Sequence, residues 1–460
     1  MSLHDLSATQ LLAHFRAKTL SPVEVTQAIL ARIVACEPRL HATYAMDAEA
    51  AMQAARLSAA RWQRGLPQGP LDGVPVMIKE NIATRGTPSP MGSAASLLSP
   101  APADAPPAAR LREAGAILLG KTTMPDFGML SSGVSSFHAT ARNPWDIHRT
   151  PGGSSAGAAS GVAAGYGPLH LGTDIGGSLR LPASWCGIFA LKPSNGRVPI
   201  DPPYYGRVAG PMTRTVADAA LMMAVLSLPD RRDAMSLPCQ ALDWADLQRD
   251  VKGLRIGLLL EAGCGLTVEP QVRAAVIAAA AAFARAGALV EAMPPFLAAP
   301  MLNGLDLFWR QRMLAEISAL PKARRDKILP FILQWAQGAR AASGAEVFEG
   351  MSQMLEMRFA AHAAFAPFDY VLSPVAPIPA FAAGLPCPTD DPARPFEHIA
   401  FTVAYNMSEQ PAASVNCGYL PDGLPIGLQI IGQRFDDLGV LQMAQAWERM
   451  RPAQRHWPQL

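Results

Sequence analysis

Short apolar segments alternate with helix-like segments along much of this 460-residue chain. The apolar runs predict strands at 74–79, 116–119, 169–172, 254–260 and 289–291. Helices are predicted at 8–18, 21–36, 46–64, 105–114, 158–164, 215–227 and 269–286. Strands that alternate with helices in this way form a sheet with helices on both faces. The sequence therefore predicts an α/β fold.

A lysine ends the first of these apolar runs. Lys79 follows Val74-Pro75-Val76-Met77-Ile78, which predicts a short buried strand. Burial lowers the pKa of a lysine because desolvation disfavours the ammonium form, and a neutral lysine can take a proton from a serine hydroxyl. Glu80 beside it would act in the opposite direction. The alternative is a lysine at a strand end whose ammonium group reaches solvent.

A second segment, Pro151-Gly152-Gly153-Ser154-Ser155-Ala156-Gly157, holds a pair of serines between glycines. Glycine allows backbone conformations and close approaches that a side chain would block. The segment is either part of a site or an ordinary loop that caps the helix at 158–164. It also matches the G-x-S-x-G pattern, but no strand is predicted directly before it, so we do not interpret it as a nucleophile elbow.

A third segment, Thr173-Asp174-Ile175-Gly176-Gly177-Ser178, follows the strand at 169–172. Two glycines before a serine allow successive backbone N–H groups to point into one small space, as in an oxyanion hole. Ser178 is the candidate nucleophile, and the candidate donors are the N–H groups of Ile175, Gly176, Gly177 and Ser178. A phosphate-binding loop is the alternative, although no Gly-Lys-Ser/Thr ending and no G-x-G-x-x-G pattern is present here.

The order and surroundings of these three segments resemble the amidase signature family of serine hydrolases. The resemblance extends from about the first helix to the last, and it includes the spacing of 24 residues between Ser154 and Ser178. Further matching motifs are Gly120–Pro125, Arg142–Asp146, Leu191–Arg197, Gly210–Asp218, Gln410–Ala412 and Gly423–Gln429.

The resemblance implies a single domain over residues 1–460, built on a large twisted mixed β-sheet with helices on both faces. Its core motifs span about 71–218, and the chain returns to the core at about 366–450. Between them, about 296–365 is a less typical helical region and a candidate for lining the substrate pocket.

The resemblance also assigns roles to the three segments. Lys79 would be the general base, Ser154 would relay a proton from within a cis peptide, and Ser178 would be acylated. Substrate and oxyanion would be held at Gly128, Ile175, Gly176 and Gly177. The supporting residues that it implies are Gly153, Ser155, Asp174 and Arg180, the last two as braces of the nucleophile loop.

The implied function is hydrolysis of an amide bond without a metal ion or another cofactor, although the same trio also allows carbamates, urethanes and esters. Thr123 replaces a usual Asn, and Gly133-Val134-Ser135 replaces the Thr-Glu-Asn of many relatives, including amidotransferase A subunits. We therefore expect aryl or medium-chain amides to be cleaved better than glutamine. The alternatives are a glutamine-dependent amidotransferase subunit that releases ammonia, and a catalytically silent binding or assembly protein.

Composition excludes several other classes of protein. Half of the residues are hydrophobic and 17% are charged, which argues against disorder. A net charge of +2 without a long Lys/Arg run gives no reason to expect nucleic acid. The six cysteines form no C-x-x-C pair, which argues against zinc, and no signal peptide or membrane span is predicted. We expect a cytoplasmic enzyme for a small amide substrate, as a monomer or a homodimer.

Two further features have competing interpretations. Met351, Met354 and Met357 lie at helical spacing within 303–357, and they predict either a stripe of the core or an apolar wall of the substrate pocket. His138 and His170 are the histidines nearest the candidate site in sequence, but neither has the context of a Ser-His-Asp triad. We therefore expect a site that uses no histidine.

Overall fold

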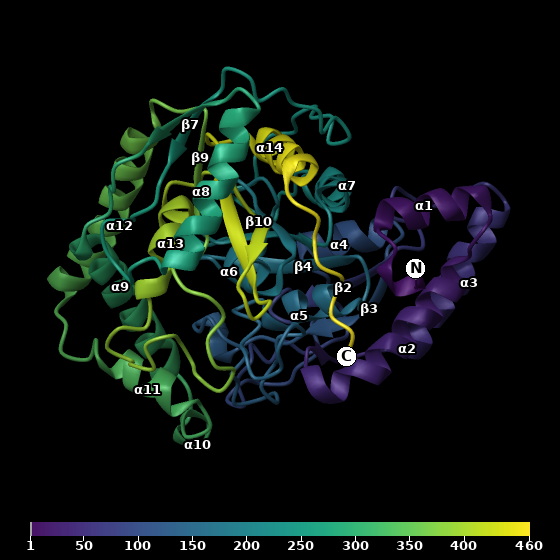
Figure 1. The fold of residues 1–460 in the computed structure, drawn as a ribbon. Helices are drawn as coiled ribbons and strands as arrows, with labels where there is room; N and C mark the ends of the chain where they lie inside the picture. The colour runs from purple at the N-terminus through teal and green to yellow at the C-terminus, as the bar shows by residue number, and fades with distance from the viewer. Residues whose placement is uncertain (1) are drawn as a thin grey trace.

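An eleven-stranded mixed β-sheet runs through the computed structural model, which describes residues 2–460 (Figure 1). Its order is β1-β3-β2-β4-β6-β5-β10-β11-β9-β7-β8. The pairs β3–β2, β2–β4, β9–β7 and β7–β8 are parallel and the others antiparallel. The strands are β1 (Thr43–Tyr44), β2 (Pro75–Lys79), β3 (Ile117–Thr122), β4 (Leu169–Asp174), β5 (Phe189–Lys192), β6 (Val208–Thr213), β7 (Arg255–Leu258), β8 (Leu289–Ala292), β9 (Tyr370–Pro374), β10 (Ala412–Tyr419) and β11 (Pro425–Ile431).

Fourteen α-helices and three short 3₁₀ helices surround this sheet in residues 2–460. The α-helices are α1 (Ala8–Ala17), α2 (Pro22–Leu40), α3 (Ala48–Gln63), α4 (Pro106–Glu113), α5 (Ala156–Ala164), α6 (Arg180–Cys186), α7 (Val216–Leu226), α8 (Pro270–Arg285), α9 (Ala299–Ser318), α10 (Lys322–Arg325), α11 (Pro330–Gln337), α12 (Gly344–Phe365), α13 (Ala400–Met407) and α14 (Asp437–Met450). The 3₁₀ helices are η1 (Leu3–Asp5), η2 (Asp126–Gly128) and η3 (Glu397–Ile399).

Helices cover both faces of the sheet, as predicted. On one face the small side chains of α5 and α6 pack against Ala190 and Met212 of the central strands. Because successive side chains of a strand point to opposite faces, Phe189 and Leu191 point the other way, into the large cluster that contains the core of α7. The same alternation in β2 sends Met77 toward the cluster of α1–α3, whereas its two neighbours in the strand point into the large cluster.

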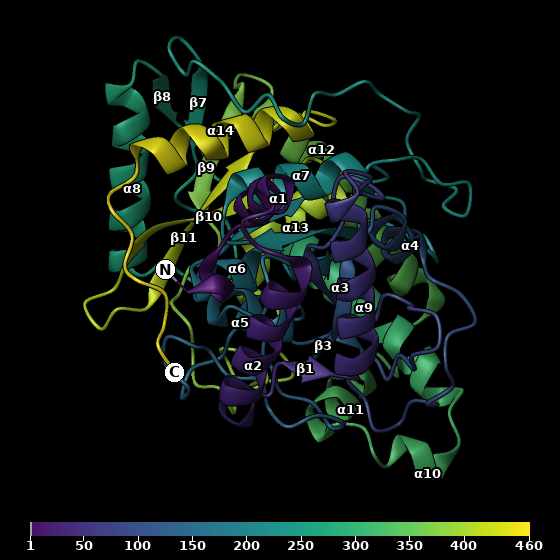
Figure 2. The ribbon, with the colours of Figure 1, turned by 90° about the vertical axis from the view of Figure 1, so that its right-hand side faces the viewer.

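The two ends of the chain lie on the side of the molecule that carries α1, α2 and α3 (Figure 2). The C-terminal segment reaches α2, where Arg32 Nη2 donates to the carbonyl oxygen of Pro458 at 3.2 Å. Helices α9, α10, α11 and α12 form the opposite edge in Figure 1. The helix-rich segment predicted at 296–365 is therefore a lateral layer beside the sheet.

The parallel pairing of β2 with β4 brings two predicted site segments together. Met77 lies opposite His170 and Ile78 opposite Leu171, so both strands end at the same edge of the sheet. Lys79 closes β2 at this edge, and the loop that carries the candidate nucleophile leaves β4 there. Side chains that are far apart in sequence meet here because parallel strands share their carboxyl edge.

The predicted elements exist, but their bounds differ. The strand predicted at 116–119 extends to Thr122, and the strand predicted at 254–260 is shorter, at Arg255–Leu258. The helix predicted at 21–36 runs on to Leu40 through Pro38. The two-residue strand β1 was not predicted, and neither were the longer strands β5, β6, β9, β10 and β11. Most residues of these longer strands are buried, so they lack the alternation of apolar and polar residues that marks a half-exposed strand.

Candidate active site

Lys79 is completely buried, so the alternative of a lysine that reaches solvent is wrong. Its ammonium nitrogen lies 2.8 Å from Ser154 Oγ, 3.1 Å from Ser155 Oγ and 3.0 Å from Thr173 Oγ1. We call Lys79, Ser154, Ser155 and Thr173 the Lys–Ser cluster. All three partners of the lysine are hydroxyl groups, which can accept a hydrogen bond from an amine without requiring a charge on it.

Burial lowers the pKa of Lys79 from 10.5 to about 7, because the desolvated ammonium form is disfavoured. The carboxylates of Asp174 and Glu80 raise it in part, and the positive charge of Arg207 lowers it further. A lysine with this pKa is about half neutral at pH 7 and can therefore accept a proton.

A lowered pKa does not by itself single out Lys79. Burial also lowers the pKa of Lys121 and that of Lys192 to about 7. Lys121 Nζ donates to Thr84 Oγ1 at 2.8 Å, and Lys192 Nζ donates to the carbonyl oxygen of Pro193 at 2.9 Å. Within the described chain neither of them is hydrogen-bonded to a serine, so the contacts with two serine hydroxyls distinguish Lys79.

Ser154 and Ser155 lie in a buried loop just before α5. The peptide bond between Gly153 and Ser154 is cis, as the resemblance implies. Gly153 has no room for a side chain, because a Cβ there would lie 2.6 Å from the carbonyl oxygen of Ser132. Ser155 Oγ donates to the carbonyl oxygen of Thr173 at 3.1 Å, which joins this loop to the end of β4.

Three free backbone donors lie in the loop of Ser178. Across residues 2–460, no acceptor is found for the N–H groups of Ile175, Gly176 and Ser178. Gly177 differs from the prediction, because its N–H donates to Asp174 Oδ1 at 2.8 Å. The buried carboxylate of Asp174 needs donors and takes this one. The candidate oxyanion hole therefore has three free N–H groups where four were expected.

Asp174 and Arg180 form a fully buried ion pair, with Arg180 Nη2 2.9 Å from Asp174 Oδ1. Desolvation alone would raise the pKa of Asp174, but the charge and hydrogen bonds of Arg180 hold it well below the usual range. The carboxylate also accepts from Leu179 N at 3.0 Å, and Arg180 Nη1 donates to Gln429 Oε1 at 2.9 Å. Asp174 at the start of the nucleophile loop and Arg180 just after it are thus joined to each other, and Arg180 connects them to β11.

Ser178 opens onto a pocket of about 320 Å³, measured with its open mouth. Gly128 connects this pocket with the Lys–Ser cluster, because a Cβ at Gly128 would lie 3.3 Å from Ser154 Oγ. Gly128 has a φ of +71°, which few residues other than glycine adopt. The pocket is lined by Gly128, Met129, Leu130, Ser131, Ile175, Gly176, Ser178, Leu181, Trp309, Phe396 and Ile399, so its walls are mainly apolar.

The helical region 296–365 contributes one wall of this pocket. Trp309 of α9 lines it, and the edge of its ring would lie 3.2 Å from a Cβ at Gly176. Met354 and Met357 belong to the core, whereas Met351 is 47% exposed, and none of the three lines the pocket. The core interpretation is therefore correct for two of the methionines, and the wall interpretation is wrong for all three.

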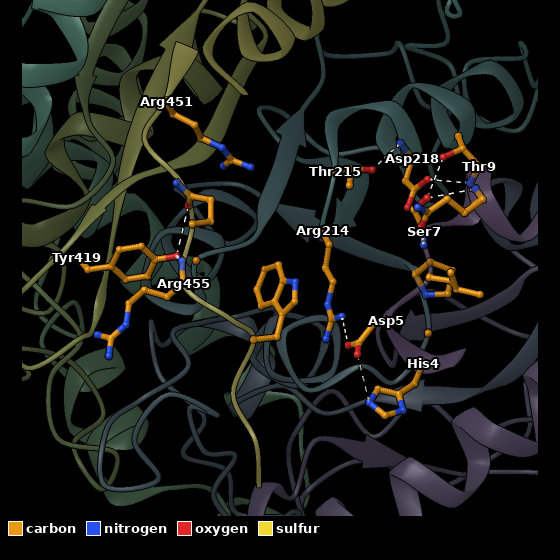
Figure 3. Close-up of a pocket in the computed structure, with 17 residues that line it drawn as sticks. His4, Asp5, Ser7, Thr9, Arg214, Thr215, Asp218, Tyr419, Arg451 and Arg455 are labelled. Carbon is orange, nitrogen blue, oxygen red and sulfur yellow. Dashed lines mark hydrogen bonds and ion pairs between the residues drawn. The ribbon is translucent and has the colours of Figure 1, made fainter. Parts of the chain in front are cut away.

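A larger cavity, about 1070 Å³ with its mouth, lies elsewhere (Figure 3). Gly167, which lines it, precedes β4, whereas Ser178 follows β4, so the cavity lies toward the opposite end of this strand. Arg214 Nη1 in this cavity donates to Asp5 Oδ1 at 2.8 Å, and Asp218 accepts the first N–H groups of α1. Its polar groups thus join the N-terminal segment to α7, and no lysine is among the described residues that line it.

Within the described chain, the two histidines nearest in sequence form no hydrogen bond with the Lys–Ser cluster. His138 Nε2 lies 2.8 Å from Glu80 Oε2. Burial lowers the pKa of His170 to about 3, and its ring nitrogens have no partner within residues 2–460. In the same described part of the chain, no group of three or more His, Cys, Asp or Glu side chains is arranged to hold a metal ion.

Sequence reasoning located Trp309 only as part of the region 296–365, and it missed other residues of this site. Thr173 belongs to no recognisable catalytic pattern, yet its hydroxyl contacts both Lys79 and Asn81. Its position directly before Asp174 at a strand end was the available signal. Leu181 was also missed, and so were Phe396 and Ile399, which come from a segment far along the chain with no fixed spacing from the nucleophile loop.

Comparisons with known proteins agree with this geometry. The family model described as Amidase matches residues 24–441, and the chain therefore belongs to the amidase signature family. It is 36% identical to the A subunit of the glutamyl-tRNA(Gln) amidotransferase of Myxococcus xanthus, over 98% of each chain.

Two solved structures with a similar fold are amidases. A bacterial aryl acylamidase of the amidase signature family superposes with a TM-score of 0.90 at 29% identity, covering 97% of this chain and 96% of that one. The peptide amidase of Stenotrophomonas maltophilia gives a TM-score of 0.85 at 28% identity, covering 99% and 98%. The chain is thus an enzyme of a family that acts on amide C–N bonds.

Within residues 2–460, no helix combines the length and the apolar character needed to cross a membrane.

Proposed function

We propose that the protein hydrolyses amide bonds through an acyl-enzyme on Ser178. Neutral Lys79 accepts a proton from Ser154, and Ser154 accepts one from Ser178 as its Oγ attacks the carbonyl carbon. The observation that carries this proposal is the buried contact of 2.8 Å between Lys79 Nζ and Ser154 Oγ. Proton transfer from Ser178 to Ser154 requires the two serines to be neighbours. Gly128 supports this, because a Cβ there would lie 3.3 Å from Ser154 Oγ and because Gly128 lines the same pocket as Ser178.

The oxyanion of the tetrahedral intermediate is stabilised by the free N–H groups of Ile175, Gly176 and Ser178. Donors that are fixed in place before the reaction stabilise developing charge without reorganisation. The relay then returns the proton to the leaving amine, which breaks the C–N bond and leaves an ester on Ser178. Water attacks this ester along the same proton path and releases the acid.

The pocket favours substrates with an apolar acyl or aryl group. The side chains that offer apolar surface to a bound substrate include Leu130, Leu181, Trp309, Phe396 and Ile399. Burial of apolar area contributes about 25 cal/mol per Å². We therefore expect aryl and medium-chain amides to have a higher kcat/KM than glutamine. Carbamates and esters are additional substrates of the same acyl-transfer chemistry.

A second candidate function is that of an amidotransferase A subunit, which would release ammonia from glutamine for a partner. The relationship to the Myxococcus xanthus protein favours this candidate, because that match covers both chains almost completely. Partner subunits would then be required for the full reaction. The apolar pocket walls and the residues Gly133-Val134-Ser135 favour the simple amidase instead.

The decisive experiment compares an acyl anilide with glutamine, with and without amidotransferase partner subunits. A higher kcat/KM for the anilide supports the amidase, and a clear preference for glutamine supports the amidotransferase. Ser178→Ala should abolish turnover and labelling by a fluorophosphonate. Ser160→Ala is the matched control and should retain both, because Ser160 is a buried serine of α5 that donates to the carbonyl oxygen of Arg142 and does not line this pocket. Labelling of Ser178→Ala at the normal rate would contradict the acyl-enzyme.

A further inference from the structure

Two arginines approach the same tyrosine ring beside the candidate active site. The guanidinium carbon of Arg312 lies 4.9 Å from the centre of the Tyr204 ring, and that of Arg207 lies 5.8 Å from it. Both distances are within the range of a cation–π interaction. We call Arg207 and Arg312 the arginine pair. Two like charges on one ring repel each other unless an anion lies close by.

Arg207 lies next to the start of the nucleophile loop. It directly precedes β6, and Val208 of β6 lies opposite Asp174 of β4 in an antiparallel register. The next position along β4 is Ile175, so continuation of this register places Arg207 opposite the first residue of the oxyanion loop. The charge of Arg207 acts on Lys79, which is consistent with this position.

Arg312 lies next to the pocket of Ser178. It follows Trp309 by one helical turn on α9, and residues three apart share a helix face. Its Nη2 also lies 3.4 Å from Met129 Sδ. Trp309 and Met129 both line the pocket. Arg207 and Arg312 are therefore both neighbours of residues that line this pocket, and they come from two unrelated elements.

The arginine pair has little compensating charge. Within residues 2–460, the one carboxylate within 4 Å of either guanidinium is that of Glu316, 3.6 Å from Arg312 Nε and 54% exposed. In the same part of the chain, the buried Arg312 Nε has no hydrogen-bond partner. Burial and the charge of Arg312 lower the pKa of Arg207, whereas Tyr204, Asp233 and Glu316 raise it in part. Arg207 Nη2 donates to the carbonyl oxygen of Pro202, which is a neutral acceptor. A bound anion would supply the charged partner that Arg207 lacks within 4 Å in the described part of the chain.

We propose that the arginine pair selects amide substrates that carry a carboxylate outside the scissile bond. This inference rests on the proposed function and adds the substrate class. The apolar pocket takes the part of the substrate next to the scissile carbonyl, and the carboxylate lies at the rim. A planar guanidinium donates two parallel hydrogen bonds to a carboxylate, so two of them can hold one such group.

The test uses two anilides of similar shape and different charge, 4-acetamidobenzoate and 4′-nitroacetanilide. The preference is the ratio of their kcat/KM values, and dividing the ratio of a variant by that of the unmodified protein cancels their intrinsic reactivity. Arg207→Gln and Arg312→Gln should each lower this preference about tenfold or more, mainly through KM of the anionic substrate. The matched control is Arg340→Gln, at an exposed arginine that pairs with no carboxylate within residues 2–460, and it should leave the preference unchanged.

Two further variants separate selection from folding. Glu316→Gln removes the competing carboxylate and should raise the preference for the anionic anilide. Arg207→Lys retains a charge and should keep part of the preference, whereas a purely structural role would make it fail like Arg207→Gln.

Three other outcomes of these experiments would contradict the arginine pair, the proposed amidase function or the carboxylate assignment. An unchanged preference in both Arg→Gln variants, with 4′-nitroacetanilide still hydrolysed, overturns the arginine pair alone. Absence of hydrolysis of both anilides by the unmodified protein overturns the proposed function together with this inference. Competitive inhibition by tRNA that disappears in Arg312→Gln, without a carboxylate preference, would show that the pair contacts a polyanion, and the carboxylate assignment would be wrong.

Discussion

The pH dependence of the reaction should follow the protonation state of Lys79. Its pKa of about 7 makes about half of the molecules neutral at pH 7. A lysine with the ordinary pKa of 10.5 would be neutral in about one molecule in 3,000 at that pH. Burial thus increases the concentration of the competent base by about a thousandfold near neutrality.

The sign of the pH effect follows from this pKa. The base is neutral above pH 7 and protonated below it, so kcat/KM should rise with pH and level off above about 8. Below pH 7 the rise should approach tenfold for each pH unit. Between pH 5 and pH 9 the total change should be about a hundredfold. The measured midpoint is an apparent pKa of the whole Lys–Ser cluster, because its groups titrate together.

Substitution of Lys79 should remove both the rate and this pH profile. Lys79→Met keeps the length of the side chain and deletes the base, and it should lower kcat by about 10²–10⁴-fold. The matched control is Lys121→Met, because Lys121 is also buried with a pKa of about 7 but contacts Thr84 instead of the site serines. This control should retain the midpoint near pH 7, even if it lowers thermal stability.

The assay is release of an aniline from a neutral acyl anilide between pH 5 and pH 9, with circular dichroism to verify folding. The lysine mechanism would be refuted if Lys79→Met kept the rate and midpoint of the unmodified protein. It would also be refuted if His138→Ala or His170→Ala, correctly folded, lost as much activity as Lys79→Met.

Three other substitutions test how the site is held in place. Gly128→Ala adds a Cβ 3.3 Å from Ser154 Oγ at a φ of +71°, and it should lower kcat about tenfold or more in anilide kinetics. Asp174→Asn leaves the buried Arg180 without its charged partner and should lower the free energy of unfolding by about 3–5 kcal/mol in urea denaturation. A loss below about 1 kcal/mol would contradict the role of this ion pair in stabilising the nucleophile loop. Trp309→Ala should raise kcat/KM for bulky acyl anilides relative to acetanilide, and an unchanged order of preference would exclude Trp309 from the pocket wall.

The residues at the centre of the candidate site could be located because they lie in short motifs, and the resemblance to the amidase signature family supplied their proposed roles. Glycines next to serines and a lysine at the end of an apolar run are visible in any single sequence. The parallel sheet then brings these motifs together, because strands β2 and β4 end at one edge. The engagement of Gly177 by Asp174 was not predicted, since the direction of one N–H group depends on the φ and ψ of its loop.

The remainder of the fold was harder to predict for two physical reasons. Strands β10 and β11 are buried in the middle of the sheet, so their sequences lack the alternation of apolar and polar residues that marks a half-exposed strand. A short, continuous apolar segment of this kind cannot be distinguished from a buried helix by its pattern. The pocket walls at Trp309, Phe396 and Ile399 depend on how a lateral layer of helices packs against the nucleophile loop. Local sequence signals carry no information about such packing.

The Lys–Ser cluster and part of the pocket wall come from different segments of the chain, so the same cluster can be combined with different substrate pockets. The residues of the proposed proton path and the candidate oxyanion donors lie within 79–178, whereas Trp309, Phe396 and Ile399 reach the pocket from later segments. Replacement of a wall residue changes which acyl group fits without moving the Lys–Ser cluster. Proteins similar to this chain include both an aryl acylamidase and the A subunit of a glutamyl-tRNA(Gln) amidotransferase. Substrate choice in this protein should therefore respond to α9 and to the 396–399 segment more than to the Lys–Ser cluster.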